Sequence, residues 1–186
     1  MSRIKSKPDN KYPWYLKLFF LNQRRKYGAE LEPAKVWGRV PRLFIGVATL
    51  FGALDRKKSP IDSQLRALIT VRVSQINWCE FCVDINSSTV LKRGGSDTRL
   101  KDLAKFRESE HFTEKEKAAL EYAEIMTYSE HKVTDELFKK LTSHYNDDEI
   151  VELTGLIAFQ NLSSKFNSAL DIAPQGFCRV APKERG

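Results

Sequence analysis

The chain has 186 residues, a formal net charge of +7 at pH 7 and only three cysteines. A single domain of this length buries about 70% of its unfolded surface, so it needs no disulfide framework to fold. Its longest uncharged apolar run, residues 43–54, is too short for a membrane-spanning helix, which needs about 20 residues. We therefore expect a single-domain protein with no stable membrane insertion.

The positive charge is concentrated at the N-terminus, where residues 1–28 contain eight basic residues and one acid. We divide the chain into a basic N-terminal arm with an amphipathic helix, residues 1–28, and a main domain, residues 29–186. A basic arm can contact nucleic acid or an anionic membrane. Because no nucleic-acid motif is present, we favour the alternative that residues 12–27 pack on the protein itself or on another subunit.

Residues 1–11 are polar and basic and lack the apolar stretch of a secretory signal peptide. Three cysteines also do not form a paired disulfide framework. Both observations predict a cytoplasmic protein in a reducing compartment.

Helical periodicity dominates the sequence, and no segment shows a convincing strand alternation, so we predict an all-α fold. Apolar spacing predicts helices over residues 15–24, 41–54 and 65–76, and a further helix from the cysteines to residue 91, before Gly94 and Gly95. Capping residues predict four later helices, which start at Ser96, at Thr113 with Glu116, at Thr134, and at Asn146 with Glu149.

Cys79 and Cys82 are the most informative feature of the chain, because they form a Cys-x-x-Cys pair directly after a predicted helix. Residues at i and i+3 lie on one face of a helix, where two thiols can form a disulfide or share a partner. If Asn77 caps the next helix, both sulfurs lie in its first turn, where the helix dipole favours the reactive thiolate.

Several other interpretations of the pair are possible. A zinc site needs two more ligands; Cys178 is a candidate, but the three histidines lack ligand spacing. An iron–sulfur cluster usually needs four cysteines, and a thioredoxin fold places its pair after a strand. Two unreactive core cysteines remain an alternative. Redox chemistry on an all-α scaffold, without a metal or cofactor, is the favoured interpretation.

Residues 68–82, Leu-Ile-Thr-Val-Arg-Val-Ser-Gln-Ile-Asn-Trp-Cys-Glu-Phe-Cys, resemble the core motif of the alkylhydroperoxidase D-like, or carboxymuconolactone decarboxylase, family. Residues 113–126, 147–170 and 171–178 also resemble its larger members. The resemblance implies an alkylhydroperoxidase D-like helical bundle that assembles as homo-trimers or hexamers. It also implies a thiol peroxidase or disulfide reductase activity in antioxidant defence.

The resemblance further implies the role of each cysteine. Cys82 matches the peroxidatic thiol, which a hydroperoxide oxidises, and Cys79 matches the proton donor and resolving thiol. An external dithiol, on a protein or a lipoyl-type group, then reduces the disulfide. We expect Asn77, Trp78 and Asn86 to support this site.

Two positions depart from the pattern of the peroxidase members. These members carry a glutamate twelve residues before the first cysteine and a histidine four residues after the second, and this chain has Ala67 and Asn86 there. Neither residue titrates, although the Asn86 amide can donate a hydrogen bond to a thiolate. The resemblance implies that this glutamate and histidine form a proton relay that deprotonates the thiol. The alternative to an enzyme is therefore a catalytically weak redox sensor, or a binding or structural member without this relay. Decarboxylase members use a histidine instead of a cysteine pair, so decarboxylation fits less well.

The remaining polar residues near the pair give weaker signals. Glu80 and Asp84 lie close to the cysteines in sequence but face other sides of the helix, so we expect both to be solvated surface charges. We expect Trp78 and Phe81 to line the thiol pocket or to fill the core. Cys178 is expected to pack in the C-terminal tail and to take no part in catalysis.

Overall fold

The computed structural model describes residues 2–179 and contains only helices and connecting segments over that range, which confirms the predicted all-α class. Met1 and residues 180–186, which we assigned to the arm and the main domain, lie outside the described residues. The helices are α1 (Trp14–Tyr27), α2 (Glu32–Trp37), α3 (Pro41–Leu54), α4 (Ser63–Ile76), α5 (Glu80–Lys92), α6 (Asp97–Asp102), α7 (Glu114–Thr127), α8 (Asp135–Thr142) and α9 (Asp147–Ala169), with short 3₁₀ turns at Asp9–Lys11 and Leu103–Lys105.

The helix boundaries follow the capping residues of the sequence. Both predicted capping boxes are present, since the backbone N–H of Glu116 donates to Thr113 Oγ1 and that of Glu149 to Asn146 Oδ1. Pro41 occupies the first turn of α3, as predicted. The backbone leaves α5 through Gly94, whose φ of 86° favours glycine.

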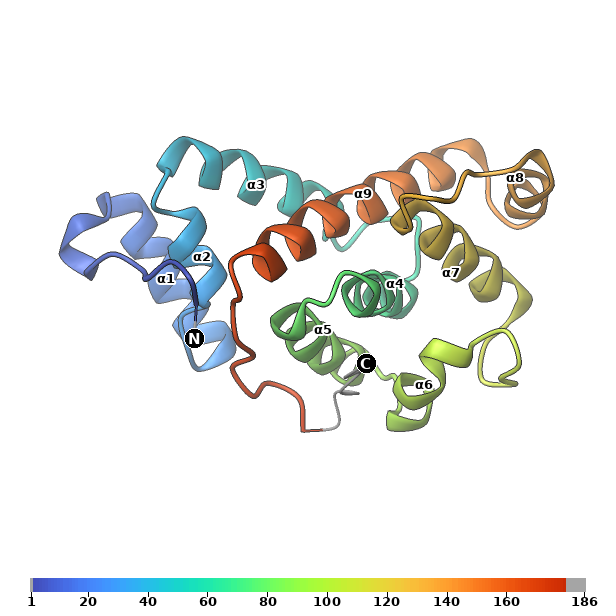
Figure 1. Cartoon of the computed structure of the whole chain (residues 1–186), viewed down its shortest axis with the longest axis horizontal. Coiled ribbons are helices and arrows are strands. Elements are labelled where there is room, and N and C mark those ends of the chain that lie inside the picture. The colour runs from blue at the N-terminus through green and yellow to red at the C-terminus, as the bar shows by residue number, and fades with distance from the viewer. Residues whose placement is uncertain (1, 180–186) are drawn as a thin grey trace.

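Helix α4 forms the centre of the molecule, and Figure 1 shows it nearly end-on, with α9 above it, α5 below it and α7 beside it. Residues 65–69 and 71–75 of α4 are buried, as expected of a helix surrounded by others. Its side chains pack with those of α7 and α9 in the main core, which includes Leu68, Ile69, Val71, Leu120 and Ile157. No helix within residues 2–179 combines the length and apolar character needed to cross a membrane.

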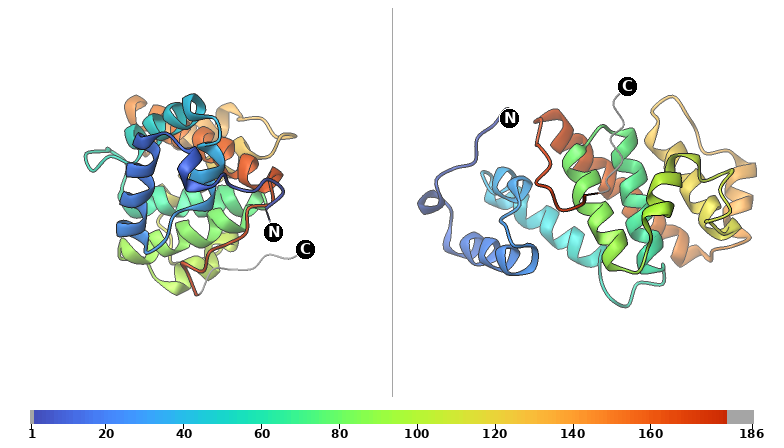
Figure 2. Two further views of the ribbon diagram at one scale, coloured as in Figure 1. Left: turned by 90° about the vertical axis from the view of Figure 1, so that its left-hand side faces the viewer. Right: turned by 90° about the horizontal axis from the view of Figure 1, so that it is seen from below.

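The N-terminal arm packs on its own chain. Figure 2 shows α1 and α2 at one end of the molecule, away from α7 and α8. Leu16 and Phe20 of α1 are buried against Trp37 and Phe44, and Trp37 stacks on Phe166 of α9 with ring centroids 3.5 Å apart. The expected contact of residues 12–27 with another subunit stays a prediction, and Trp14 and other apolar side chains of α1 remain exposed.

A buried ion cluster joins α4 to α7. Glu124 of α7 accepts a hydrogen bond from Arg72 Nε of α4 at 2.6 Å, and its other carboxylate oxygen forms an ion pair with Arg107 Nη1 at 2.7 Å. The Glu124 side chain is almost completely removed from solvent. Because a buried charge without a partner is very unfavourable, the two arginines hold this carboxylate in place.

We expect Glu124→Gln to lower the free energy of unfolding by about 3–5 kcal/mol, because it removes the buried negative charge that both Arg72 and Arg107 contact. Glu114→Gln on the same helix is the matched control, since the Glu114–Lys117 pair lies at the surface and should contribute at most about 1 kcal/mol. Urea denaturation of both variants tests this. Equal effects would show that the buried cluster does not stabilise the fold specifically.

Candidate redox site

The turn between α4 and α5 brings the two cysteines together. Helix α4 ends at Ile76, Asn77 caps its C-terminus, and Trp78 adopts a left-handed conformation with φ of 55°. Cys79, not Asn77, is the N-cap of α5, and its Sγ accepts a hydrogen bond from the backbone N–H of Cys82 at 3.2 Å. The expectation that Asn77 caps α5 is wrong because Asn77 ends the preceding helix.

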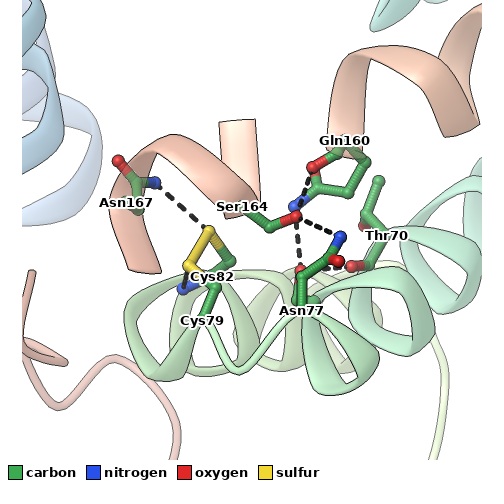
Figure 3. The surroundings of a disulfide bond; sticks show 8 residues. Thr70, Asn77, Cys79, Cys82, Gln160, Ser164 and Asn167 are labelled. Atoms are coloured by element: carbon green, nitrogen blue, oxygen red, sulfur yellow. Dashed lines mark hydrogen bonds between the residues drawn. A yellow bond between two sulfur atoms is a disulfide. The ribbon is translucent and has the colours of Figure 1, made fainter. Parts of the chain in front are cut away.

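Cys79 and Cys82 are joined by a disulfide, with their Cα atoms 5.2 Å apart. Cys82 lies in the first turn of α5, as predicted, and Cys79 directly precedes the helix. Figure 3 shows the Asn167 side chain of α9 pointing at Cys82, and its Nδ2 lies 3.2 Å from Cys82 Sγ. The Asn167 Oδ1 atom is buried and has no hydrogen-bond partner among the described residues.

A cavity of about 710 Å³ borders Cys82. Helices α1, α2 and α3 line one side of it, and α4, α5, α9 and the C-terminal tail line the other. Its wall is rich in aromatic rings, contributed by Phe19, Tyr27, Trp37, Phe44, Phe51, Phe81, Phe159 and Phe177. Cys82 belongs to this wall and Cys79 does not, so Cys82 is the member of the pair that a small molecule in the cavity would meet.

Ala67 and Asn86, the two departures from the peroxidase pattern, line the same cavity as Cys82. The two positions that hold the glutamate and histidine in peroxidase members therefore line the same space as Cys82. Asp55 is the one acidic side chain in the described part of the cavity wall, and it bonds to Arg93 at 2.7 Å. None of the three histidines belongs to the wall, which leaves Cys82 without an evident general base.

A polar network fixes the cysteine turn to α9 (Figure 3). Asn77 Nδ2 donates to Asn161 Oδ1 at 2.8 Å and to Ser164 Oγ at 2.9 Å. One turn earlier, Gln160 Nε2 donates to Ser74 Oγ at 2.8 Å. Asn77 therefore positions the turn through α9, at a distance from the cavity, instead of contacting the sulfurs.

Trp78 lies outside the cavity wall and its side chain is 64% exposed. The expectation that Trp78 lines the thiol pocket or fills the core is therefore wrong. Its left-handed backbone turns the side chain away from the packed helices. Phe81 behaves as expected: it is buried, lines the cavity and makes an edge-to-face contact with Phe177.

Asp84 is not a solvated surface charge, because its residue is only 3% exposed. Its carboxylate accepts hydrogen bonds from the backbone N–H groups of Gln175, Gly176 and Cys178, at 2.9, 2.7 and 2.7 Å. These bonds hold the C-terminal tail across α5. The expectation failed because the partners are backbone groups 91–94 residues away, which side-chain patterns do not reveal.

Glu80 and Cys178 lie outside the cavity wall. Glu80 is exposed, as expected. Cys178 lies half-buried in the tail as a free thiol and does not line the cavity. Within residues 2–179 there is no cluster of histidine, cysteine or acidic residues able to hold a metal ion.

Sequence reasoning missed the contribution of α9 to the site. Gln160, Ser164 and Asn167 are spaced at i, i+4 and i+7, so they share one face of α9. All three are buried, and they reach Ser74, Asn77 and Cys82 respectively. A polar stripe along an otherwise apolar helix is the signal that would have identified this face.

We expect Asp84→Asn to release the C-terminal tail and to lower the free energy of unfolding by about 1–3 kcal/mol, because an amide cannot replace the carboxylate as the acceptor of all three N–H groups. Limited proteolysis should then cleave within residues 171–179 much faster than in the parent protein. Glu80→Gln, in the same helix but exposed, is the control and should leave this cleavage unchanged. If the tail resisted proteolysis equally in Asp84→Asn and in the parent, the role of Asp84 in holding the tail would be contradicted.

Comparison with known proteins places this geometry in a family. The sequence pattern of the carboxymuconolactone decarboxylase family matches residues 41–124, which include both cysteines. The uncharacterized protein YnjA of Escherichia coli K12 is 43% identical over 176 residues, which cover 95% of this chain and 97% of YnjA.

Two solved structures show the same fold at lower sequence identity. The alkylhydroperoxidase AhpD core of an uncharacterized peroxidase-related protein from Ralstonia eutropha JMP134 superposes with a TM-score of 0.85 at 19% identity, covering 95% of this chain and 94% of that one. The debrominase Bmp8 superposes with a TM-score of 0.81 at 22% identity, covering 92% and 91%. The chain belongs to the carboxymuconolactone decarboxylase family and has the alkylhydroperoxidase D-like fold.

Proposed function

We propose that this protein is a cofactor-free thiol peroxidase or disulfide reductase in which Cys82 is the reactive thiol and Cys79 the resolving thiol. The observation that carries the proposal is that Cys82 borders the cavity while the sulfur of Cys79 lies outside its wall. The position of Cys82 in the first turn of α5 favours the thiolate, because the helix dipole is positive there. The Asn167 amide adds a hydrogen bond to the same sulfur.

The reaction has three balanced steps. The Cys82 thiolate attacks the terminal oxygen of a hydroperoxide, the O–O bond breaks, and with one proton an alcohol and a Cys82 sulfenic acid form. The Cys79 thiol then attacks the Cys82 sulfur, which forms the disulfide and releases water. An external dithiol, on a protein or a lipoyl-type group, finally reduces the disulfide by thiol–disulfide exchange and is itself oxidised.

The route of the reductant follows from burial. Cys79 is 2% and Cys82 3% exposed, so a reductant does not reach the sulfurs from the outer surface of the resting fold. The cavity supports access to Cys82 for a slender dithiol arm. Attack on Cys82 would release Cys79 as the leaving thiolate, which the N-terminus of α5 stabilises.

A catalytically weak redox sensor is the second candidate function, and Ala67 and Asn86 favour it. A general base usually contributes about 10²–10⁴-fold to the rate of such a proton-coupled step. Without it, one oxidation per molecule would still form the disulfide, but turnover would be slow. Rapid multiple turnovers with a dithiol would support the enzyme; a single slow oxidation would support the sensor.

The roles of the two cysteines can be separated by mass spectrometry of the intact protein after one equivalent of cumene hydroperoxide. The reduced parent should lose two hydrogens, and Cys79→Ser should instead gain one oxygen, as a sulfenic acid that has no resolving partner. Cys82→Ser should stay unmodified at Cys79. Cys178→Ser is the control and should behave as the parent. Oxidation of Cys79 in Cys82→Ser at the parent's rate would contradict the assignment.

Restoring the relay should raise activity. The double variant Ala67→Glu, Asn86→His places two titratable groups in the cavity wall that also contains Cys82. We expect the rate of thiol oxidation to rise by up to about 10²–10⁴-fold, the usual contribution of a general base. The same double change in a Cys82→Ser background is the control and should show no activity. Stopped-flow measurement of thiol oxidation gives the rates. An unchanged rate in a folded double variant would mean that proton transfer does not limit the reaction.

A further inference from the structure

The cavity wall carries an excess of positive charge. Lys26, Arg66, Lys92 and Arg93 line it, and Asp55 is the only acidic side chain in its described part. Because an apolar cavity lowers the effective dielectric constant, such an excess attracts an anion more strongly than the same charges would in water. The cavity is therefore suited to a ligand that is mostly apolar but has one anionic group.

Two of the four cationic side chains share one carboxylate oxygen. Arg66 Nη1 lies 3.5 Å and Arg93 Nη2 lies 2.7 Å from Asp55 Oδ1, so two guanidinium groups share it. The Lys92 ammonium lies over the Tyr27 ring, 5.9 Å from its centroid. The neighbouring Arg56 is already paired with Glu152, and Asp62 caps α4. These positions leave positive charge unmatched at the end of α5 away from Cys82.

Arg66 is the unusual member of this group, because only 6% of its surface is accessible to solvent. Its Nη1 donates to the Leu54 carbonyl at 2.8 Å, and its buried Nε has no hydrogen-bond partner among the described residues. Burial lowers the pKa of the Arg66 guanidinium, but an arginine stays protonated at neutral pH. A buried cation of this kind is stabilised when an anion comes close to it.

The distance from this group to Cys82 sets the length of the ligand. Arg93 follows Cys82 by eleven residues, and at 1.5 Å per residue along α5 the two positions are separated by about 16 Å. Along α5 the wall between them is formed by Ile85 together with the polar residues Asn86, Ser88 and Thr89, and the aromatic rings of Phe51 and Phe159 from α3 and α9 also line the cavity. An extended chain advances about 1.2 Å per bond, so about 13 bonds span this distance.

We propose that the cavity binds a long-chain carboxylate, with the head group at Arg66 and Arg93 and the chain directed toward Cys82. This inference rests on the redox function proposed above. The substrate class is then a fatty-acid-like hydroperoxide that carries its peroxide group within the chain. The products are the corresponding hydroxy acid and a Cys82 sulfenic acid, which Cys79 converts to the disulfide with release of water. The volume of the cavity lies in the range of small-molecule sites.

Binding of ligands that contain no peroxide tests the site independently of the reaction. In calorimetric titration of the oxidised full-length protein, dodecanoate should bind about 10- to 100-fold more tightly than methyl dodecanoate, because only the acid bears the charge. Arg66→Met should remove this preference and leave the affinity for the ester unchanged. Arg56→Gln, a surface change outside the cavity wall, is the matched control and should keep the parent's preference.

A second measurement tests the direction of the chain. Saturating tetradecanoate, a carboxylate whose chain is long enough to span the distance between Arg93 and Cys82, should slow reduction of the Cys79–Cys82 disulfide by a small dithiol severalfold, because the chain would occupy the space beside Cys82. Equal affinity of the parent for acid and ester, or an undiminished reduction rate at saturation, would overturn the proposal. The acid–ester comparison uses the parent protein, so it remains decisive if Arg66→Met fails to fold.

The two proposals fail in different ways. Selective binding of dodecanoate by a protein that does not reduce hydroperoxides would leave the carboxylate site standing and remove the peroxidase. Reduction of cumene hydroperoxide without any preference for carboxylates would leave the peroxidase standing and remove the carboxylate site.

Discussion

The buried amide of Asn77 is the constraint on which the geometry of the site depends. Its two hydrogen bonds, to Asn161 and Ser164, fix the turn between α4 and α5 against α9. Asn167 lies one turn beyond Ser164 on the same helix, so the bonds that hold the turn also set the Asn167 amide opposite Cys82. These buried hydrogen bonds favour one arrangement of the helices, because shifting α9 along α4 would leave several of the groups without partners.

Most of the fold could be predicted from local sequence signals. The capping boxes at Thr113 and Asn146, Pro41 and Gly94 all act within a few residues, and the structure has each of them where the sequence indicated. The cysteine pair was equally recognisable. One error and one omission concern contacts between distant segments: Asp84 is covered by a tail 91 residues later, and Asn167 reaches Cys82 from another helix. The polar stripe on α9 marks a buried face, but local sequence does not identify which residues of another segment such a group contacts.

Two features of the site act in opposite directions on its reactivity. The helix terminus and the Asn167 amide stabilise a thiolate at Cys82, whereas an aromatic cavity with Ala67 and Asn86 provides no group to accept the thiol proton. The family fold itself does not decide the chemistry, since the same helical arrangement occurs in a peroxidase-related protein and in a debrominase. Reactivity in this chain therefore depends on the side chains that surround Cys82.

The residues that line the cavity come from two parts of the chain. Cys82, Ala67, Asn86 and the arginines lie within residues 41–124, the segment that matches the family, whereas α1, α2, α9 and the tail contribute lining residues from outside it. Part of the surface that a ligand would contact is thus encoded outside the segment that holds the cysteines. Substitutions in that part can change which molecule the cavity admits while the Cys79–Cys82 pair is kept. Relatives that share the central segment can accordingly diverge in substrate without evolving a new reaction.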